Sequence, residues 1–301
     1  MILVDKINRS GDLVNELCRD GNAVNKAYRS GELIYQRCVN EDYVSRDYFS
    51  FEIISGGSIC WKNIYYEQLG VYTPQSIYYK INDGWWNLLV SNPSGATFNV
   101  NAGDYVSFKG NYDINTTSDI PSFCGTTATF NACGNIMSLI YGDNFEGVLT
   151  MGQGKQFDDL FFRCNTLINA KDLLMPATTL SYSCYQGTFR YCSSLITAPE
   201  LPATNLTELC YNGMFIGCTS LASAPELPAT TLASDCYLHM FGDCSSLNYV
   251  KCLATDISAS GCVSDWLKNV SSSGTFVKAA SMSSWTTGNS GIPSGWTVVN
   301  A

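Results

Sequence analysis

The chain has 301 residues, 17 basic against 26 acidic, and a formal net charge of −9 at pH 7. Such a length predicts two or three domains, and the excess acid disfavours binding to nucleic acid because it repels phosphates. The N-terminus meets Asp5 too early for a secretory signal, and no apolar run approaches a membrane span, so we expect cytosolic synthesis. Sparse charge (14%) beside abundant aromatic residues (13%) favours a mainly β fold.

Residues 1–46 contain a repeat of ten residues. The units RSGDLVNELC (9–18), RDGNAVNKAY (19–28) and RSGELIYQRC (29–38) align without gaps. Arg-x-Gly beside an acidic or amide residue is typical of a tight turn, and the segments between turns are each long enough for one strand. The pattern predicts a small β-meander with too few apolar residues for its own core, so we expect this anchor segment to pair with another chain. The residues expected to direct this assembly are Arg9, Gly11, Arg19, Gly21, Arg29, Gly31, Leu33, Ile34 and Tyr35.

Residues 47–145 show several short strand patterns separated by turns. Residues 48–53 alternate partly, and residues 77–81 run into the turn 82–84 and out through Trp85 and Trp86, which predicts a hairpin. Residues 98–100 lead through the turn 102–104 to residues 105–108, which predicts a second hairpin. Such a series favours a β-sandwich over a barrel.

Trp85 and Trp86 are expected to point to opposite faces of a strand because they are neighbours in sequence. One of them would belong to the core. The other would either form a platform for a sugar ring or, as we favour, pack across strands against Tyr78 or Tyr79.

The region from residue 146 to residue 267 repeats with a period of 26 residues. A fixed period with constant apolar positions predicts a solenoid in which each repeat is one coil and equivalent side chains form ladders. The first coil carries two extra residues, since the interval from Cys164 to Cys192 exceeds the period by that amount. Residues 268–301 lack the period and are expected to form a C-terminal cap. The repeated positions include Pro176, Pro202 and Pro228; Cys184, Cys210, Cys236 and Cys262; Tyr185, Tyr211 and Tyr237; Phe189, Phe215 and Phe241; and Cys192, Cys218 and Cys244.

Candidate ligand-facing residues come from two kinds of position in the coils. The tyrosine ladder either lines a binding surface or forms half-buried spacers with exposed hydroxyls. Positions that vary between coils are better placed to set specificity, because core positions are constrained by stacking. The candidates are Tyr182, Tyr185, Arg190, Glu208, Tyr211, Tyr237 and His239, together with Trp85 and Trp86.

The sequence offers little support for catalysis or metal binding. Most of the 14 cysteines fall in the ladders, where parallel Cβ directions disfavour disulfides. Metal binding is disfavoured because the sequence has no CxxC pair and only one histidine, His239. The acidic pairs Glu41-Asp42 and Asp158-Asp159 are interpreted as solvated surface. We therefore expect free thiols, no metal, no cofactor and no enzymatic activity.

Several motifs resemble those of a known family. The unit Leu-Pro-Ala-Thr-Thr-Leu-x-x-x-Cys-Tyr-x-x-Met-Phe-x-x-Cys-Ser-Ser-Leu at 227–247 resembles the BspA-like leucine-rich repeat of gut Bacteroidetes and their phages. The segments GNIMSLIYGD (134–143) and SGIPSGW (290–296) are similar to parts of such proteins, and the repeats cover about half of the chain. The N-terminal units resemble short hairpins in tail and fibre proteins of phages, including crAss-like phages. The resemblance implies adhesion or structural display.

The resulting functional hypothesis is a phage virion protein, such as a fibre or appendage subunit, on the virion surface. Its N-terminus would dock on other virion proteins and form a homo-oligomer, with a trimer favoured for a fibre. The sandwich and solenoid would meet a glycan or protein of the host surface. A bacterial cell-surface adhesin is the second hypothesis, and an enzyme acting on surface glycans is the third.

Overall fold

The computed structural model describes residues 48–64, 73–111, 120–152 and 154–301, together with the backbone of residues 13–19, 22–29 and 32–35. The fold is mainly β, as expected, and the described residues include only one short α-helix and one 3-10 turn. The chain divides into two compact units, Met1–Val44 and Ser45–Ala301.

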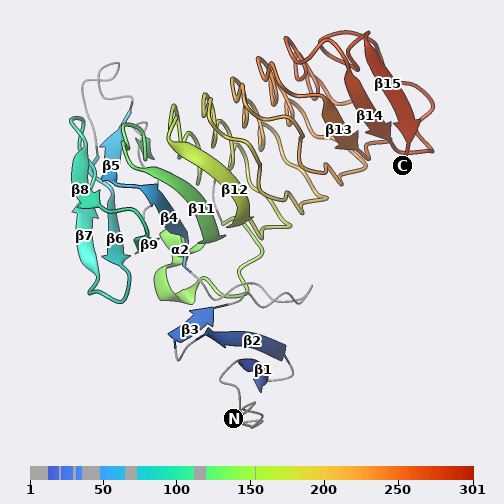
Figure 1. Cartoon of the computed structure of the whole chain (residues 1–301). Helices are drawn as coiled ribbons and strands as arrows, with labels where there is room; N and C mark the ends of the chain where they lie inside the picture. The colour runs from blue at the N-terminus through green and yellow to red at the C-terminus, as the bar shows by residue number, and fades with distance from the viewer. Residues whose placement is uncertain are drawn as a thin grey trace. The chain divides into compact units, whose positions relative to one another are not determined.

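The N-terminal unit holds a three-stranded antiparallel sheet in the order β1-β2-β3 (Figure 1). Strand β1 spans Leu13–Arg19, β2 spans Asn22–Arg29 and β3 spans Glu32–Tyr35. Arg19 pairs with Asn22 and Arg29 pairs with Glu32 at the two ends of β2, which confirms the predicted meander. Arg9, Gly11, Gly21 and Gly31, four of the residues assigned to assembly, lie outside the described residues.

Residues 48–135 supply strands to two sheets. Their bounds are β4 Ser50–Ser55, β5 Gly57–Asn63, β6 Ser76–Ile81, β7 Asn87–Val90, β8 Ala96–Val100, β9 Tyr105–Gly110, β10 Pro121–Ser122 and β11 Thr129–Asn135. With β12 (Leu167–Leu174) from the repeat region, one sheet has six strands in the order β12-β11-β4-β9-β6-β7, and the other has three in the order β10-β5-β8. Strands β6 and β7 pair antiparallel on either side of the turn at residues 82–84, so the first predicted hairpin is confirmed.

The second predicted hairpin is wrong. Strand β8 pairs with β5 in the three-stranded sheet, whereas β9 pairs with β4 and β6 in the six-stranded sheet. The turn at residues 102–103 therefore carries the chain from one sheet to the other. A tight turn signal is local, and it does not specify whether the two strands that it joins pair with each other.

A cluster of aromatic side chains fills the space between the two sheets. Phe51 and Phe108 belong to the six-stranded sheet, and Trp61 belongs to the three-stranded sheet. The ring of Phe123 lies 4.9 Å from Phe51, 5.1 Å from Phe108 and 4.9 Å from Trp61, centroid to centroid. All four side chains are fully buried, so Phe123 joins the two sheets through one core.

The repeat region continues the six-stranded sheet. Helix α2 (Ser138–Tyr141) and the 3-10 turn η1 (Gly142–Asn144) follow β11, and β12 (Leu167–Leu174) then pairs with β11 in parallel. Phe161, in the first repeat, lies within about 6 Å of Phe49 and Phe123 of the sheets and 5.3 Å from Phe189 of the next repeat. The two regions thus share one hydrophobic core.

Successive repeats are joined by backbone hydrogen bonds. Tyr185 N–H donates to the carbonyl of Cys210 (2.9 Å) and Phe189 N–H donates to that of Met214 (2.9 Å), and both acceptors belong to the next repeat. Alternate amides close turns within the repeat, as when Thr188 N–H donates to the carbonyl of Tyr185 (3.3 Å). About half of the amides between Tyr185 and Phe189 therefore donate to carbonyls of the neighbouring repeat, although this segment is neither helix nor strand.

The phenylalanine ladder follows the stacking that the period predicts. The rings of Phe161, Phe189, Phe215 and Phe241 lie 5.3, 5.3 and 5.5 Å apart, and the planes of Phe189, Phe215 and Phe241 are within 1° of parallel. All four side chains are fully buried. Each contributes roughly 1.5–3 kcal/mol through burial, which is realised only when both neighbouring repeats are in place.

The cysteine ladders have a structural role in the described repeats. The thiols of Cys192, Cys218 and Cys244 donate to the carbonyls of Phe161, Phe189 and Phe215, at 3.0, 3.1 and 3.0 Å. Twelve cysteines in the described residues are free thiols. Burial raises the pKa of the Cys244 thiol to about 12, so it stays protonated and able to donate.

The C-terminal residues keep the parallel stacking after the sequence period ends. Strands β13 (Tyr249–Cys252), β14 (Gly274–Lys278) and β15 (Trp296–Asn300) form a parallel sheet. Tyr249 pairs with Thr275 at the spacing of the repeats, whereas Thr275 pairs with Thr297 at a shorter spacing. In Figure 1 these strands lie at the C-terminal end of the stack.

Candidate functional site

The tyrosine ladder lies inside the protein and faces no ligand, contrary to both interpretations of the sequence. Tyr185, Tyr211 and Tyr237 are at most 2% exposed. Their rings stack in line with Phe157 before them and Trp266 after them, at centroid separations of 5.5–6.2 Å. We call the series Phe157, Tyr185, Tyr211, Tyr237, Trp266 and Trp285 the aromatic column. Stacking in this column removes the hydroxyls from the surface, so these tyrosines are core residues.

The candidates at variable positions are more accessible. Tyr182 is 49% exposed and Glu208 is also exposed, and both occupy the same position of consecutive repeats. His239 is half-buried, with a positive φ of 53°, in the position that Gly187 and Gly213 occupy in the two preceding repeats. Tyr182 and Glu208 therefore lie on neighbouring repeats, whereas His239 belongs to a later one.

Trp85 and Trp86 lie in the connection that precedes β7, because the strand begins only at Asn87. The Trp85 side chain is 91% exposed. Trp86 is half-buried and contacts Tyr48 edge-on at 5.1 Å. Trp86 thus packs on Tyr48, while the ring of Tyr79, one of its two expected partners, stacks on Phe98 at 3.7 Å.

Two lysines surround Trp86 on the outer side of the six-stranded sheet. The Nζ atoms of Lys80 and Lys109 lie 5.3 and 4.6 Å from its ring centroid, within the range of cation–π attraction. Lys109 Nζ also donates to the carboxylate of Asp143 at 2.7 Å, and Tyr48 Oη donates to the same carboxylate at 2.6 Å. Burial, together with this hydrogen bond, raises the pKa of Tyr48 to about 12, while the Lys109 hydrogen bond lowers the pKa of Asp143.

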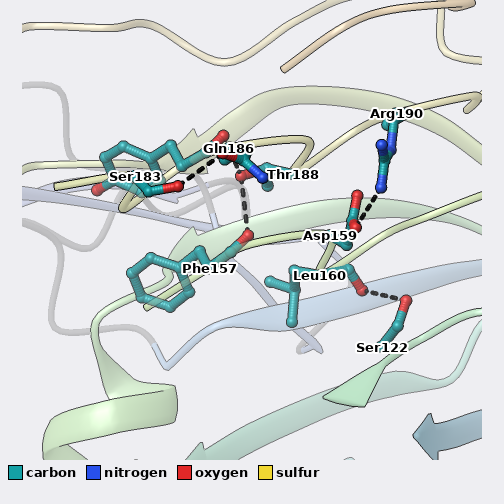
Figure 2. Close-up of polar contacts among 9 residues, drawn as sticks. Ser122, Phe157, Asp159, Leu160, Ser183, Gln186, Thr188 and Arg190 are labelled. Atoms are coloured by element: carbon teal, nitrogen blue, oxygen red, sulfur yellow. Dashed lines mark hydrogen bonds and ion pairs between the residues drawn. The ribbon is translucent and has the colours of Figure 1, made fainter. Parts of the chain in front are cut away.

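The acidic pair Asp158-Asp159 is buried, which corrects the expectation of a solvated surface. The two residues are 3% and 1% exposed. Asp159 forms an ion pair with Arg190 of the next repeat, as Figure 2 shows. Burial, and then the charge of Asp159, raise the pKa of Asp158 to about 8, whereas Arg190 and Lys155 act in the opposite direction. At neutral pH the Asp158 carboxyl is therefore largely protonated.

Hydrogen bonds hold this acidic segment from both sides (Figure 2). Ser122, in β10, donates from Oγ to the carbonyl of Leu160 at 3.0 Å. Thr188, in the next repeat, donates from Oγ1 to the carbonyl of Phe157 at 3.0 Å. The first repeat is thus fixed between the two-sheet region and the second repeat, and its carboxylate–guanidinium pair is part of that connection.

Arg190 connects the buried pair to an aromatic group at the surface. Its guanidinium carbon lies 5.0 Å from the ring centroid of Phe162, and that of Arg163 lies 5.0 Å from the same centroid. Tyr191 is 39% exposed and lies 5.6 Å from the Arg163 guanidinium carbon. Arg190 is thus held in place by Asp159 and Phe162, and the exposed contacts are made by its neighbours.

One signal in the aligned repeats points to the buried aspartate. Asp159 precedes Gly187 by the same interval that separates Cys164 from Cys192, so the two residues occupy equivalent positions of consecutive repeats. A Cβ atom on Gly187 would overlap Oδ1 of Asp159, so glycine leaves room for the carboxylate. When a repeat has glycine at the position where the preceding repeat has an acidic residue, the acidic side chain has room to point into the protein.

Comparison of the chain with known protein families, characterised proteins and solved structures finds no match. Within the described ranges, no three His, Cys, Asp or Glu side chains gather in a way that could hold a metal ion. No helix in the described part of the chain has the length and apolar character needed to cross a membrane.

Proposed function

We propose that this protein is a structural and adhesive subunit of a phage virion, such as a fibre or appendage. In this proposal the N-terminal meander docks on other virion proteins. Residues 47–145 form a β-sandwich, 146–267 a BspA-like leucine-rich-repeat solenoid and 268–301 its cap, and these parts display a surface to the host. The family assignment rests on the repeat motif and on the segments at 134–143 and 290–296, which resemble parts of such proteins.

The observation that carries the proposal is the continuity of the larger unit. Strand β12 of the repeats pairs with β11 of the sheets, and one hydrophobic core runs through both. Amide-to-carbonyl bonds then join successive repeats up to the C-terminal sheet. A shared core and continuous hydrogen bonding hold surface residues in fixed relative positions, as a display protein requires.

The N-terminal unit has the properties of an attachment element. It forms a compact unit of its own, and in the described residues β1 and β3 each have a single neighbouring strand. Open strand edges are satisfied by strands of another chain, which favours a homo-oligomer, with a trimer as the proposed state, or pairing with a virion protein.

Mass spectrometry of purified phage particles tests the proposal directly. The expected result is that peptides of this chain copurify with the capsid and tail proteins through a density gradient, at a constant ratio to them. Enrichment in the outer-membrane fraction of uninfected cells would instead support the bacterial adhesin. Hydrolysis of surface glycans by the purified chain would support the enzyme alternative.

A further inference from the structure

The aromatic column ends at a pocket near the C-terminus. Its planes remain within 13° of parallel from Tyr237 to Trp266 and on to Trp285, at centroid separations of 6.2 and 5.6 Å. In the described part of the chain no further ring stacks beyond Trp285. Trp285 is also only partly buried, unlike Trp266, which is fully buried. The column thus finishes on an indole that contributes to the wall of a pocket.

The pocket combines an apolar side with a hydrogen-bonding side. Trp285, Trp296 and Ile292 supply the apolar part, and its volume is about 200 Å³. Ser283, Ser284, Thr287 and Ser294 supply hydroxyls and Lys278 an ammonium group. Pockets for drug-sized ligands measure roughly 300–1,000 Å³, so this one suits a single small ring.

The three C-terminal tryptophans differ in the hydrogen bonds of their indole N–H groups. Nε1–H of Trp285 is buried and has no hydrogen-bond acceptor in the described residues. The corresponding Nε1–H groups of Trp266 and Trp296 donate to the carbonyls of Gly291 (2.9 Å) and Ser271 (2.8 Å). The hydrogen bond of Trp296 fixes one indole of the pocket wall in a constant orientation, which gives a ligand ring a flat surface to pack against.

We propose that this pocket binds the pyranose ring of a glycan, with a sugar face packed against the tryptophan wall. Tryptophan provides a flat apolar surface for the ring's C–H groups, and the surrounding hydroxyls match a ring that bears hydroxyls on its edge. An aromatic side chain of a protein would fit the wall, but it would leave most of these hydroxyls without partners. The inference rests on the proposed display role and specifies its ligand class.

The test follows the tryptophan indole N–H signals by ¹⁵N-edited NMR on the full chain. The signal of Trp285 is assigned with Trp285→Phe, and the protein is titrated with methyl glycosides of glucose, galactose, mannose and N-acetylglucosamine. At least one glycoside should shift this signal in a saturable way, with a dissociation constant in the millimolar range, as is typical of small ligands with few contacts.

Two phenylalanine substitutions separate pocket binding from a general effect. Ser284→Phe places bulk at the pocket, whereas Ser281→Phe places the same bulk on an exposed residue of the preceding turn that does not line it. Ser284→Phe should weaken glycoside binding at least tenfold, and Ser281→Phe should leave it unchanged.

Three results would overturn the inference. One is the absence of a saturable shift with every glycoside, and another is equal binding by both phenylalanine variants. The third is binding of N-acetyltryptophanamide with no response to glycosides, which would make the pocket a site for a protein side chain. Incorporation of Ser284→Phe into particles is measured separately, so a failure of sugar binding is distinguishable from a failure of the virion role.

Discussion

Asp158 should make the stability of the protein fall as pH rises. Its carboxyl has a pKa of about 8 in the folded protein against an ordinary value of 3.8, and the residue is 3% exposed. At pH values between these two pKa values, the Asp158 carboxyl is ionised in the unfolded chain but protonated in the folded chain. Stabilisation is therefore complete below about pH 4 and is lost as pH rises towards 8. The free energy of unfolding decreases by about 1.4 kcal/mol per pH unit from this group, on the order of 6 kcal/mol over the whole window.

Urea unfolding of the wild type and of Asp158→Asn at several pH values between about 5 and 8 measures this effect. The asparagine variant keeps the shape of the side chain but does not titrate. The difference in unfolding free energy between variant and wild type should therefore grow in favour of the variant by about 1.4 kcal/mol per pH unit. Comparing differences cancels the titration of groups that lie far from Asp158 and do not interact with it.

Asp83 provides the matched control, since it lies exposed in the turn between β6 and β7. Asp83→Asn should follow the wild type across the same pH range. A flat difference for Asp158→Asn would show that Asp158 is ionised in the folded protein, and the buried position of the acidic pair would then be wrong.

Three further predictions concern the repeats. Phe215→Ala removes a fully buried ring flanked by two parallel rings, so it should cost about 3–5 kcal/mol in urea unfolding, and a loss below about 1 kcal/mol would place Phe215 outside the core. Thiol titration of the denatured, unreduced protein should find the ladder cysteines free, and oxidation of most of the 14 cysteines would contradict the stacking geometry. Gly187→Ala and Gly213→Ala share a φ of 58°, which costs each about 1 kcal/mol, but only Gly187→Ala should lose more because its Cβ overlaps Asp159. Equal losses would mean that the Asp159 carboxylate lies elsewhere.

The contacts between repeats could be predicted from the sequence because residues one period apart stack on one another. Phe189, Phe215 and Phe241 recur every 26 residues, and identical side chains at identical positions of consecutive coils lie beside one another. The same argument places the cysteine columns. The period does not say which side of a coil faces inwards. For this reason the sequence predicts surface or half-buried positions for the tyrosine ladder, whereas the structure places it in the core.

The remaining differences come from contacts between parts of the chain that no local pattern relates. The turn between β8 and β9 has the sequence of a hairpin turn, but each strand finds its partners in a different sheet. Asp158-Asp159 has the sequence of a solvated pair, but the ion pair of Asp159 is made with Arg190 of the next repeat. Trp86 likewise packs on Tyr48, which lies far away in sequence.

In the proposed function the N-terminal unit attaches the protein to the particle and the larger unit presents a surface to the host. The most direct measurement is the incorporation of a chain lacking residues 1–46 into phage particles, compared with the full chain expressed at the same level. We expect the truncated protein to keep the circular dichroism spectrum of the larger unit and to sediment as a monomer, but to be absent from gradient-purified particles. A truncated protein that is folded and still enters particles at the level of the full chain would contradict it.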